Sequence, residues 1–191
     1  MSERIRRPSA RVTLQLMISL RGTEPVIWRR VLVPGGMTLE RLHSVIQAAM
    51  GWENRHLHIF EIHGERFAPP DFEFEEEERD LDEEGVRIHT LLAEGDHFTY
   101  EYDFGDCWHH DIQVEVVRDV TISMKQAVCI DGARRCPPED CGGTTGFENF
   151  LLAISDPTHL DYAALVEWNG GPFDLEQFNL GEANVQIQLN R

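Results

Sequence analysis

Long apolar runs are missing from this sequence. The one early apolar stretch, residues 12–20, is interrupted by Thr13, Gln15 and Ser19, and it is too short to cross a bilayer. It also lacks the flanks of a secretory signal peptide. We therefore expect a cytoplasmic protein with no membrane partner.

Positive charge is also scarce. The 191 residues include 17 Lys and Arg against 34 Asp and Glu, a formal net charge of -17. Non-specific binding to nucleic acid depends on basic groups that neutralise phosphates, so this balance argues against a nucleic-acid partner. The charge is uneven, however, because seven arginines lie within residues 4–30. This basic segment keeps a nucleic-acid-associated accessory role open as an alternative.

Cysteine is sparse, with four residues in the chain. In a cytoplasmic protein we expect these cysteines to be reduced thiols or metal ligands rather than to form disulfides. Cys129, Cys136 and Cys141 have a C-x6-C-x4-C spacing, which differs from the compact C-x2-C pattern of common zinc sites. Together with His110 they could still form a Cys3His site for zinc or another divalent metal. The alternative is that the thiols pack as small apolar groups.

An apolar fraction of 41% is enough for an ordinary core, and the length suits one domain. We expect a flexible tail at residues 1–10 and a single α+β domain over residues 11–191. Alternating apolar and polar residues predict a mixed or antiparallel sheet. The segments with this pattern are 12–20, 26–33, 56–64, 98–102 and 111–117.

The predicted helices pack on and follow this sheet. Thr38 and Gly51 flank a segment with apolar residues three and four positions apart, which we interpret as a long N-terminal helix packed on the sheet. Shorter helical patterns at residues 147–154 and 162–168 predict a helical C-terminal part. Residues 67–85 and 129–143 are rich in proline, glycine or acidic residues, which predicts loops.

The chemically richest stretch is residues 98–110, which read FTYEYDFGDCWHH. Its strand pattern ends at a turn-prone Asp-Phe-Gly-Asp tetrapeptide, Asp103 to Asp106. Residues 111–117 fit the returning strand of a hairpin, which would bring His109 close to Asp103. Two prolines and three glycines in residues 129–143 indicate a loop held by its side chains, a ligand or a metal.

We expect a pocket between the Asp103–Asp106 turn and the Cys136–Gly143 part of that loop. Its candidate lining residues are Trp28, Arg29, His56, His58, Asp103, Asp106, Trp108, His110, Glu139 and Asp140.

Several motifs occur together in this chain. They are PVIWRR at 25–30, TLERLH at 38–43, IQAAMGW at 46–52, HLHIF at 56–60, YDFGDxWxH at 102–110 and CPPEDCGG at 136–143. In content and order they resemble the plasmid pRiA4b open-reading-frame-3-like family, over roughly Val12 to Phe178. The resemblance implies an α+β domain of undetermined biochemical function, and it favours His110 over His109, because W-x-H ends at His110.

Some members of that family are labelled mobile-element passengers or resolvase-like. A serine recombinase needs a nucleophilic serine near arginines and a helix-turn-helix, and this chain shows neither pattern. We therefore do not extend the resolvase label to it.

Two functions stay open for the pocket. A binding or interaction module would use it for a protein or small-molecule partner. A metal-dependent hydrolase-like enzyme would use a cluster of carboxylates and imidazoles to bind a divalent ion and activate water. The members of that cluster would be His56, His58, Asp103, Asp106 and His110. The structural alternative is that Asp103 and Asp106 only cap the turn through hydrogen bonds to the backbone.

Overall fold

The computed structural model describes residues 11–70, 80–122 and 124–190. Their strands form one mixed sheet in the order β5-β4-β3-β6-β7-β1-β2-β8. Neighbouring strands are antiparallel, except that β4 and β5 are parallel. The strands are β1 (Val12–Leu20), β2 (Trp28–Pro34), β3 (His58–Ile62), β4 (Glu65–Ala68), β5 (Leu81–Asp82), β6 (His97–Tyr102), β7 (Trp108–Asp119) and β8 (Val128–Ala133).

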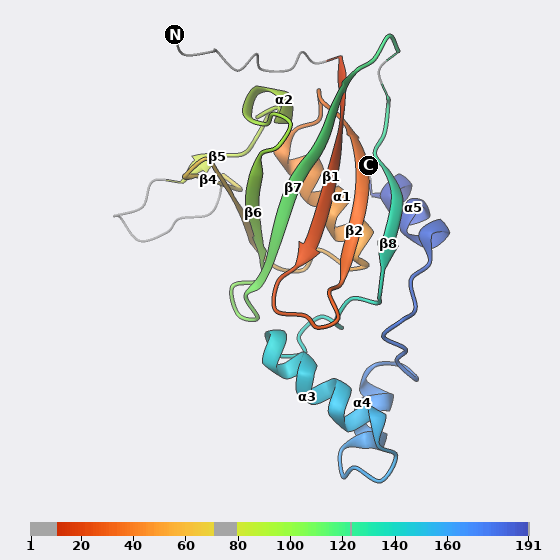
Figure 1. Cartoon of the computed structure of the whole chain (residues 1–191). Helices are drawn as coiled ribbons and strands as arrows, with labels where there is room; N and C mark the ends of the chain where they lie inside the picture. The colour runs from red at the N-terminus through yellow and green to blue at the C-terminus, as the bar shows by residue number, and fades with distance from the viewer. Residues whose placement is uncertain (1–10, 71–79, 123, 191) are drawn as a thin grey trace.

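Five helices accompany the sheet in the described ranges: α1 (Leu39–Met50), α2 (Ile88–Leu91), α3 (Gly143–Ser155), α4 (Tyr162–Trp168) and α5 (Leu180–Leu189). Helix α1 crosses one face of the sheet, α5 lies beside β8, and α3 and α4 extend beyond one end of the strands (Figure 1). The α+β class, the mixed sheet and the helical C-terminal part are thus confirmed.

The expectation of a long N-terminal helix is wrong. The described chain begins with strand β1, and α1 has 12 residues and follows two strands. The physical reason is the alternation that starts at Val12, which buries Leu14, Leu16 and Ile18 completely on one side of β1. Only after Pro34 does the apolar period change from two to three or four residues.

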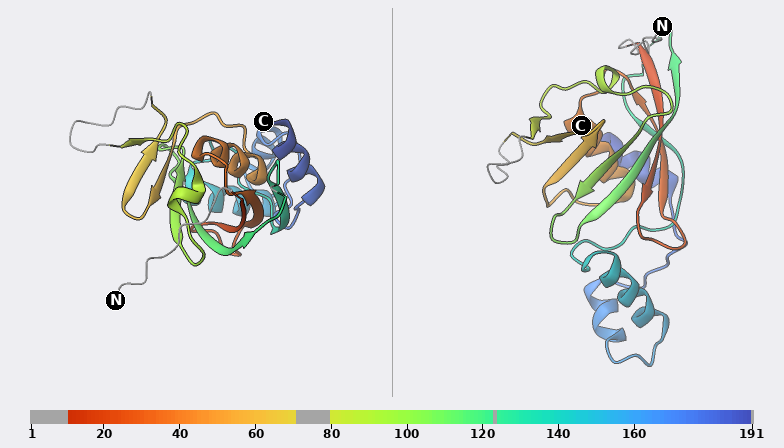
Figure 2. Two further views of the ribbon diagram at one scale, coloured as in Figure 1. Left: turned by 90° about the horizontal axis from the view of Figure 1, so that it is seen from above. Right: turned by 60° about the vertical axis from the view of Figure 1, so that its left-hand side comes forward.

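The core lies between α1 and the sheet, which curves around the helix (Figure 2). Leu39, Leu42 and Val45 of α1 are fully buried. The helix ends at Gly51, whose left-handed φ of 93° suits glycine, and the Gly51 N–H donates to the Gln47 carbonyl. This sharp stop sends Trp52 and the following residues toward the end of the sheet where β6 turns into β7.

Two segments expected as loops contain strands. Residues 128–133 form β8, which pairs with β2, although Gly132 lowers the strand propensity there. A Cβ on Gly132 would lie 2.8 Å from the Phe178 ring, so the glycine allows close packing. Residues 67–85 contain the end of β4 and all of β5.

The hairpin predicted around residues 98–117 is formed by β6 and β7, with Tyr102 opposite Trp108. His109 lies opposite Glu101, one pair away from the turn, so hairpin geometry does not place it beside Asp103. The expected tail, residues 1–10, lies outside the described residues. Among the described helices, none has the length and apolar character needed to cross a membrane.

Candidate functional site

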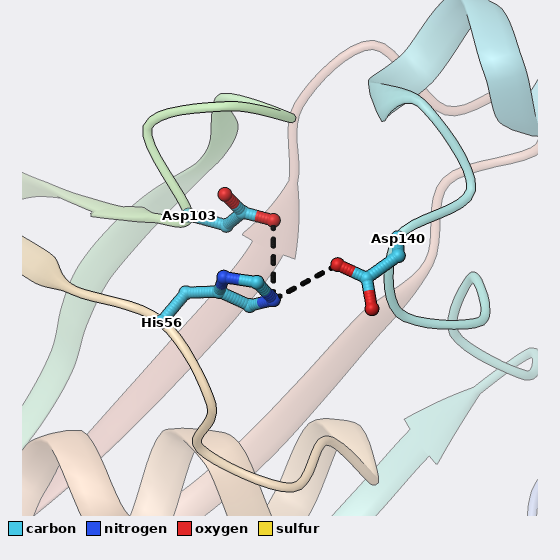
Figure 3. A group of neighbouring side chains, drawn as sticks. All are labelled: His56, Asp103 and Asp140. Carbon is cyan, nitrogen blue, oxygen red and sulfur yellow. Dashed lines mark ion pairs between the residues drawn. The ribbon is translucent and has the colours of Figure 1, made fainter.

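Three segments that are distant in the sequence meet at the β6–β7 end of the sheet. His56 precedes β3, Asp103 follows β6, and Asp140 belongs to the loop between β8 and α3 (Figure 3). The His56 Nε2 atom lies 3.0 Å from Asp140 Oδ1 and 3.6 Å from Asp103 Oδ2. One ligand atom from each residue lies within 4.8 Å of the other two, an arrangement that could hold a metal ion. We call these three residues the His56 cluster.

The turn after β6 fixes the direction of Asp103. The residue has a left-handed φ of 59°, and its Oδ1 accepts a hydrogen bond of 3.0 Å from the Gly105 N–H. The second oxygen, Oδ2, is thereby directed toward His56. Asp103 is only 8% exposed, so this carboxylate is held in a largely dehydrated place.

Asp106 fastens the same turn to the loop that carries Asp140. Its Oδ2 accepts a 3.0 Å hydrogen bond from the Gly142 N–H. The next residue, Gly143, has a φ of 67°, and a Cβ there would lie 2.4 Å from the Asp106 carbonyl oxygen. Only glycine fits this approach, so turn and loop are in direct backbone contact.

Glu139 attaches the loop to the segment before β3. Its Oε1 accepts a 2.6 Å hydrogen bond from the Glu53 N–H and a 3.2 Å hydrogen bond from the Tyr102 hydroxyl. Burial raises the pKa of Tyr102 to about 12, so the phenol stays neutral and can donate. Trp52 adds a 2.9 Å bond from its Nε1 to the Pro137 carbonyl.

The cluster opens to solvent on the side of Asp140, whose side chain is 58% exposed, whereas that of His56 is 30% exposed. A depression of about 410 Å³ borders it and is lined by Trp52, Arg55 and the loop residues 135–140 among others. A ligand in this depression could therefore reach an ion bound by the cluster.

A family model for the plasmid pRiA4b ORF-3-like protein matches residues 12–182. The chain belongs to this family. Among curated relatives, the uncharacterized protein y4hQ of Sinorhizobium fredii (strain NBRC 101917 / NGR234) is 37% identical over 179 residues, covering 91% of this chain and 90% of the relative. Among solved structures, the protein of unknown function MM3350 from Methanosarcina mazei Go1 is 31% identical with a TM-score of 0.79, covering 90% of this chain and 97% of that one.

In this plasmid pRiA4b ORF-3-like protein, the core takes up two histidines expected at the pocket. His58 is 5% exposed, its Nε2 lies 3.1 Å from a Glu83 oxygen, and its ring stacks on His43 at 3.5 Å. His110 is fully buried, and its Nδ1 lies 3.1 Å from the Trp108 carbonyl. Burial lowers the pKa of His110 to about 4. The structure therefore does not bring these two histidines to the His56 cluster.

Arg29 connects elements rather than offering a free guanidinium. Arg29 is 2% exposed. Its guanidinium donates hydrogen bonds to the Cys136 sulfur and to the backbone carbonyls of Ala49, Trp28, Ala133 and Arg134. It borders a cavity of about 720 Å³, but these five contacts use all of its N–H groups. It therefore has none left for a ligand.

The two candidate tryptophans also have structural contacts. Trp108 is 1% exposed and its ring centroid lies 5.8 Å from that of Trp52. Trp28 lies on β2, the strand next to β8, and the Arg30 guanidinium lies 5.2 Å from the centroid of its ring. Of the ten candidate pocket residues, His56, Asp103 and Asp140 meet, while Asp106 and Glu139 hold their surroundings in place.

Cys129, Cys136, Cys141 and His110 do not form a metal-ligand group within the described ranges. There, the His56 cluster is the group of His, Cys, Asp and Glu side chains whose ligand atoms come together. Cys129 and Cys136 are buried. Burial raises the pKa of all three thiols, to about 12 for Cys141, where Asp106 adds to the effect. These surroundings favour neutral thiols.

The arginines of the expected basic surface are engaged where the structure describes them. Arg21 pairs with Asp111, and the Arg30 Nε lies 2.8 Å from a Glu115 oxygen. Arg4, Arg6 and Arg7 lie outside the described residues.

Sequence reasoning missed Tyr102 and Glu53 as residues that organise the site. The strand pattern treats Tyr102 as an apolar position, the last one before the turn, and the YDFGDxWxH motif that begins with it gives its hydroxyl no role. A hydroxyl at the end of a buried strand needs a partner, and that signal points to a nearby loop.

Proposed function

We propose that this plasmid pRiA4b ORF-3-like protein is a binding module that takes a divalent transition-metal ion at the His56 cluster and a ligand in the adjoining depression. The observation that supports this proposal best is the convergence of an imidazole and two carboxylates from three separate segments. Backbone and side-chain hydrogen bonds hold each of the segments independently of any ion.

The distances suit a metal ion. Zinc lies about 2.0 to 2.2 Å from nitrogen and oxygen ligands, so two ligands of one such ion are separated by about 3.3 to 3.6 Å at tetrahedral angles and by about 2.8 to 3.1 Å at right angles. The separations from His56 Nε2 are 3.0 and 3.6 Å. One imidazole with two carboxylates suits zinc or manganese better than ions that prefer only thiolates or only oxygens.

His56 Nε2 provides a second line of support. The atom is buried and has no hydrogen-bond partner among the described residues, although Asp140 Oδ1 is 3.0 Å away. The carboxylates are thus near Nε2 without being aligned for a hydrogen bond. In a metal site the ligand atoms face the ion rather than each other, whereas a plain ion pair would favour alignment.

Metal titration of the full chain, purified without an affinity tag and stripped with chelator, tests the proposal. We expect one Zn²⁺ or Mn²⁺ per chain by calorimetry, and an affinity at least about tenfold lower in Asp140→Asn, which keeps the shape but removes the charge. The matched control is Asp119→Asn at the far end of β7. The absence of stoichiometric binding would overturn the proposal, as would binding that survives Asp140→Asn and is lost in Cys136→Ser.

A hydrolase-like activity is a second candidate, favoured by the exposed side of the cluster. Three protein ligands leave positions on an ion for water and substrate, and Asp140 is accessible from the depression. Metal-loaded protein should then hydrolyse 4-nitrophenyl phosphate or acetate faster than metal alone, and Asp103→Asn should abolish the difference. Equal rates with and without protein would leave binding as the function.

A further inference from the structure

A second hollow adjoins the His56 cluster on the side of α3 and α4. This cleft has a volume of about 600 Å³, and its lining includes Leu152, Leu165 and Trp168 together with Asp140. Volumes of this order are typical of sites for small molecules. Because Asp140 also belongs to the His56 cluster, the cleft and the proposed ion share one side chain.

The apolar wall of the cleft is exposed. Leu152 is 68% exposed and Trp168 is 49% exposed. The Phe150 ring meets that of Trp168 at a centroid distance of 5.9 Å and an angle of 71°, which holds the indole in place while about half of its surface stays accessible. Exposed apolar side chains that line a hollow are typical of ligand sites.

The polar end of the cleft fixes what kind of ligand fits. Asp140 is the most exposed member of the His56 cluster, and both Asp140 and Trp168 also line the neighbouring 410 Å³ depression. A purely apolar ligand would leave the ion unused, and a purely polar ligand would leave Trp168 and Leu152 uncovered. A molecule with an oxygen-donor head and an apolar body matches both ends.

We propose that the α3–α4 cleft binds the apolar body of a small amphiphile whose head, a carboxylate or a similar pair of oxygens, coordinates the ion at the His56 cluster. This inference rests on the proposed function, because the head is held by the ion. The body lies against Trp168, Leu152 and Leu165, and it accounts for the exposure of Trp168 and Leu152.

Two hydroxamates test the inference, because they share a metal-chelating head and differ in the body. Acetohydroxamate carries a methyl group and 2-naphthohydroxamate a naphthyl ring. With the full chain loaded with Zn²⁺ or Mn²⁺, we expect the naphthyl compound to bind about tenfold tighter, since burial of about 60 Å² of additional apolar surface is worth about that factor. The difference in affinity of the two compounds for the free ion is subtracted first.

Two exposed leucines provide a matched pair of variants. Leu152 lines the cleft, whereas Leu160 is 98% exposed and is not part of the lining. Leu152→Asn should reduce the preference for the naphthyl compound at least threefold, and Leu160→Asn should leave it unchanged. Because both side chains are exposed, neither variant should unfold the chain, and circular dichroism checks this.

The outcomes separate the two proposals. Metal-dependent binding of both hydroxamates with equal affinity would overturn the amphiphile inference and leave the metal site standing, and so would a preference that Leu152→Asn does not change. Failure of the chain to bind the ion itself would overturn both. A preference for the naphthyl compound that needs the ion and Leu152 supports the inference.

Discussion

Replacing Gly143 with alanine should separate the turn after β6 from the loop that carries Asp140. The added Cβ would lie 2.4 Å from the Asp106 carbonyl oxygen, and φ is 67°. A left-handed φ costs about 1 kcal/mol for alanine relative to glycine. The steric overlap must also displace the loop, which breaks the bond from Gly142 N–H to Asp106, worth about 1 to 1.5 kcal/mol at this solvent-exposed position.

The expected loss of unfolding free energy is therefore about 2 to 2.5 kcal/mol, measured by urea denaturation. Gly170→Ala is the matched control, because Gly170 has a φ of 74° and nothing within 4 Å of the position of a Cβ. It should cost only the conformational part, about 1 kcal/mol. Equal losses in the two variants would refute the conclusion that close contact with Asp106 requires glycine at residue 143.

Three further predictions concern buried polar groups. Arg29→Lys should destabilise the chain by about 3 kcal/mol, since one ammonium cannot replace five guanidinium contacts. Arg30→Lys, at an ion pair whose side chains are 25% and 20% exposed, should cost less than about 1 kcal/mol. A similar loss of unfolding free energy in both variants would contradict this. Burial lowers the pKa of His110 to about 4, below its ordinary value of about 6.5. As pH falls, the unfolded chain therefore binds a proton at this residue before the folded chain does. The free energy of unfolding should be unaffected by His110 above about pH 6.5 and should decline between pH 6.5 and 4. In urea denaturation, His110→Gln should reduce the slope of that decline by up to about 1.4 kcal/mol per pH unit. Parallel plots of unfolding free energy against pH for the two proteins would exclude a contribution from His110. Because burial raises the pKa values of Cys129 and Cys136, iodoacetamide at pH 7.5 should modify these two thiols only after unfolding in urea, whereas the exposed Cys107 should react in the native chain. Rapid labelling of Cys129 or Cys136 in the native chain, located by peptide mass spectrometry, would contradict this.

Local patterns predicted the elements that bury one face. The alternation in residues 12–20 and the helical spacing between Thr38 and Gly51 correspond to β1 and α1, because each pattern reports a face turned to the core. Strand β8 was missed because it is short and contains Gly132. Its formation depends on pairing with β2 and on packing against Phe178, and these contacts are distant in the sequence.

The sequence drew attention to two motifs, at residues 102–110 and 136–143, and these are in contact in the structure. A ligand site between them stays a prediction. Which imidazole joins them depends on how the strands present their faces. His58 and His110 point into the core, whereas His56 precedes β3 and is free of its alternation. A residue just outside a strand has no face assigned by periodicity, and its direction can be found only from the tertiary contacts.

Asp106 connects the packing of this region to its proposed chemistry, although it is not a member of the His56 cluster. Its bond to Gly142 holds the loop in the position that brings Asp140 to within 3.0 Å of His56. An ion bound at the proposed site would join the same turn and loop from the other side. Ion binding and loop docking would then stabilise each other, and binding should raise the unfolding free energy by about 2.7 kcal/mol at an ion concentration one hundred times the dissociation constant.

This coupling makes Asp106→Ala informative. The variant keeps all three ligands but removes the acceptor of the Gly142 N–H, so part of the ion's binding free energy must be spent on positioning the loop. We expect the affinity for the ion to fall about fivefold to tenfold, which corresponds to the loss of one hydrogen bond of about 1 to 1.4 kcal/mol. Isothermal titration with Asp119→Ala as the control measures this, and an unchanged affinity would show that the ligands are positioned without the Asp106 bond.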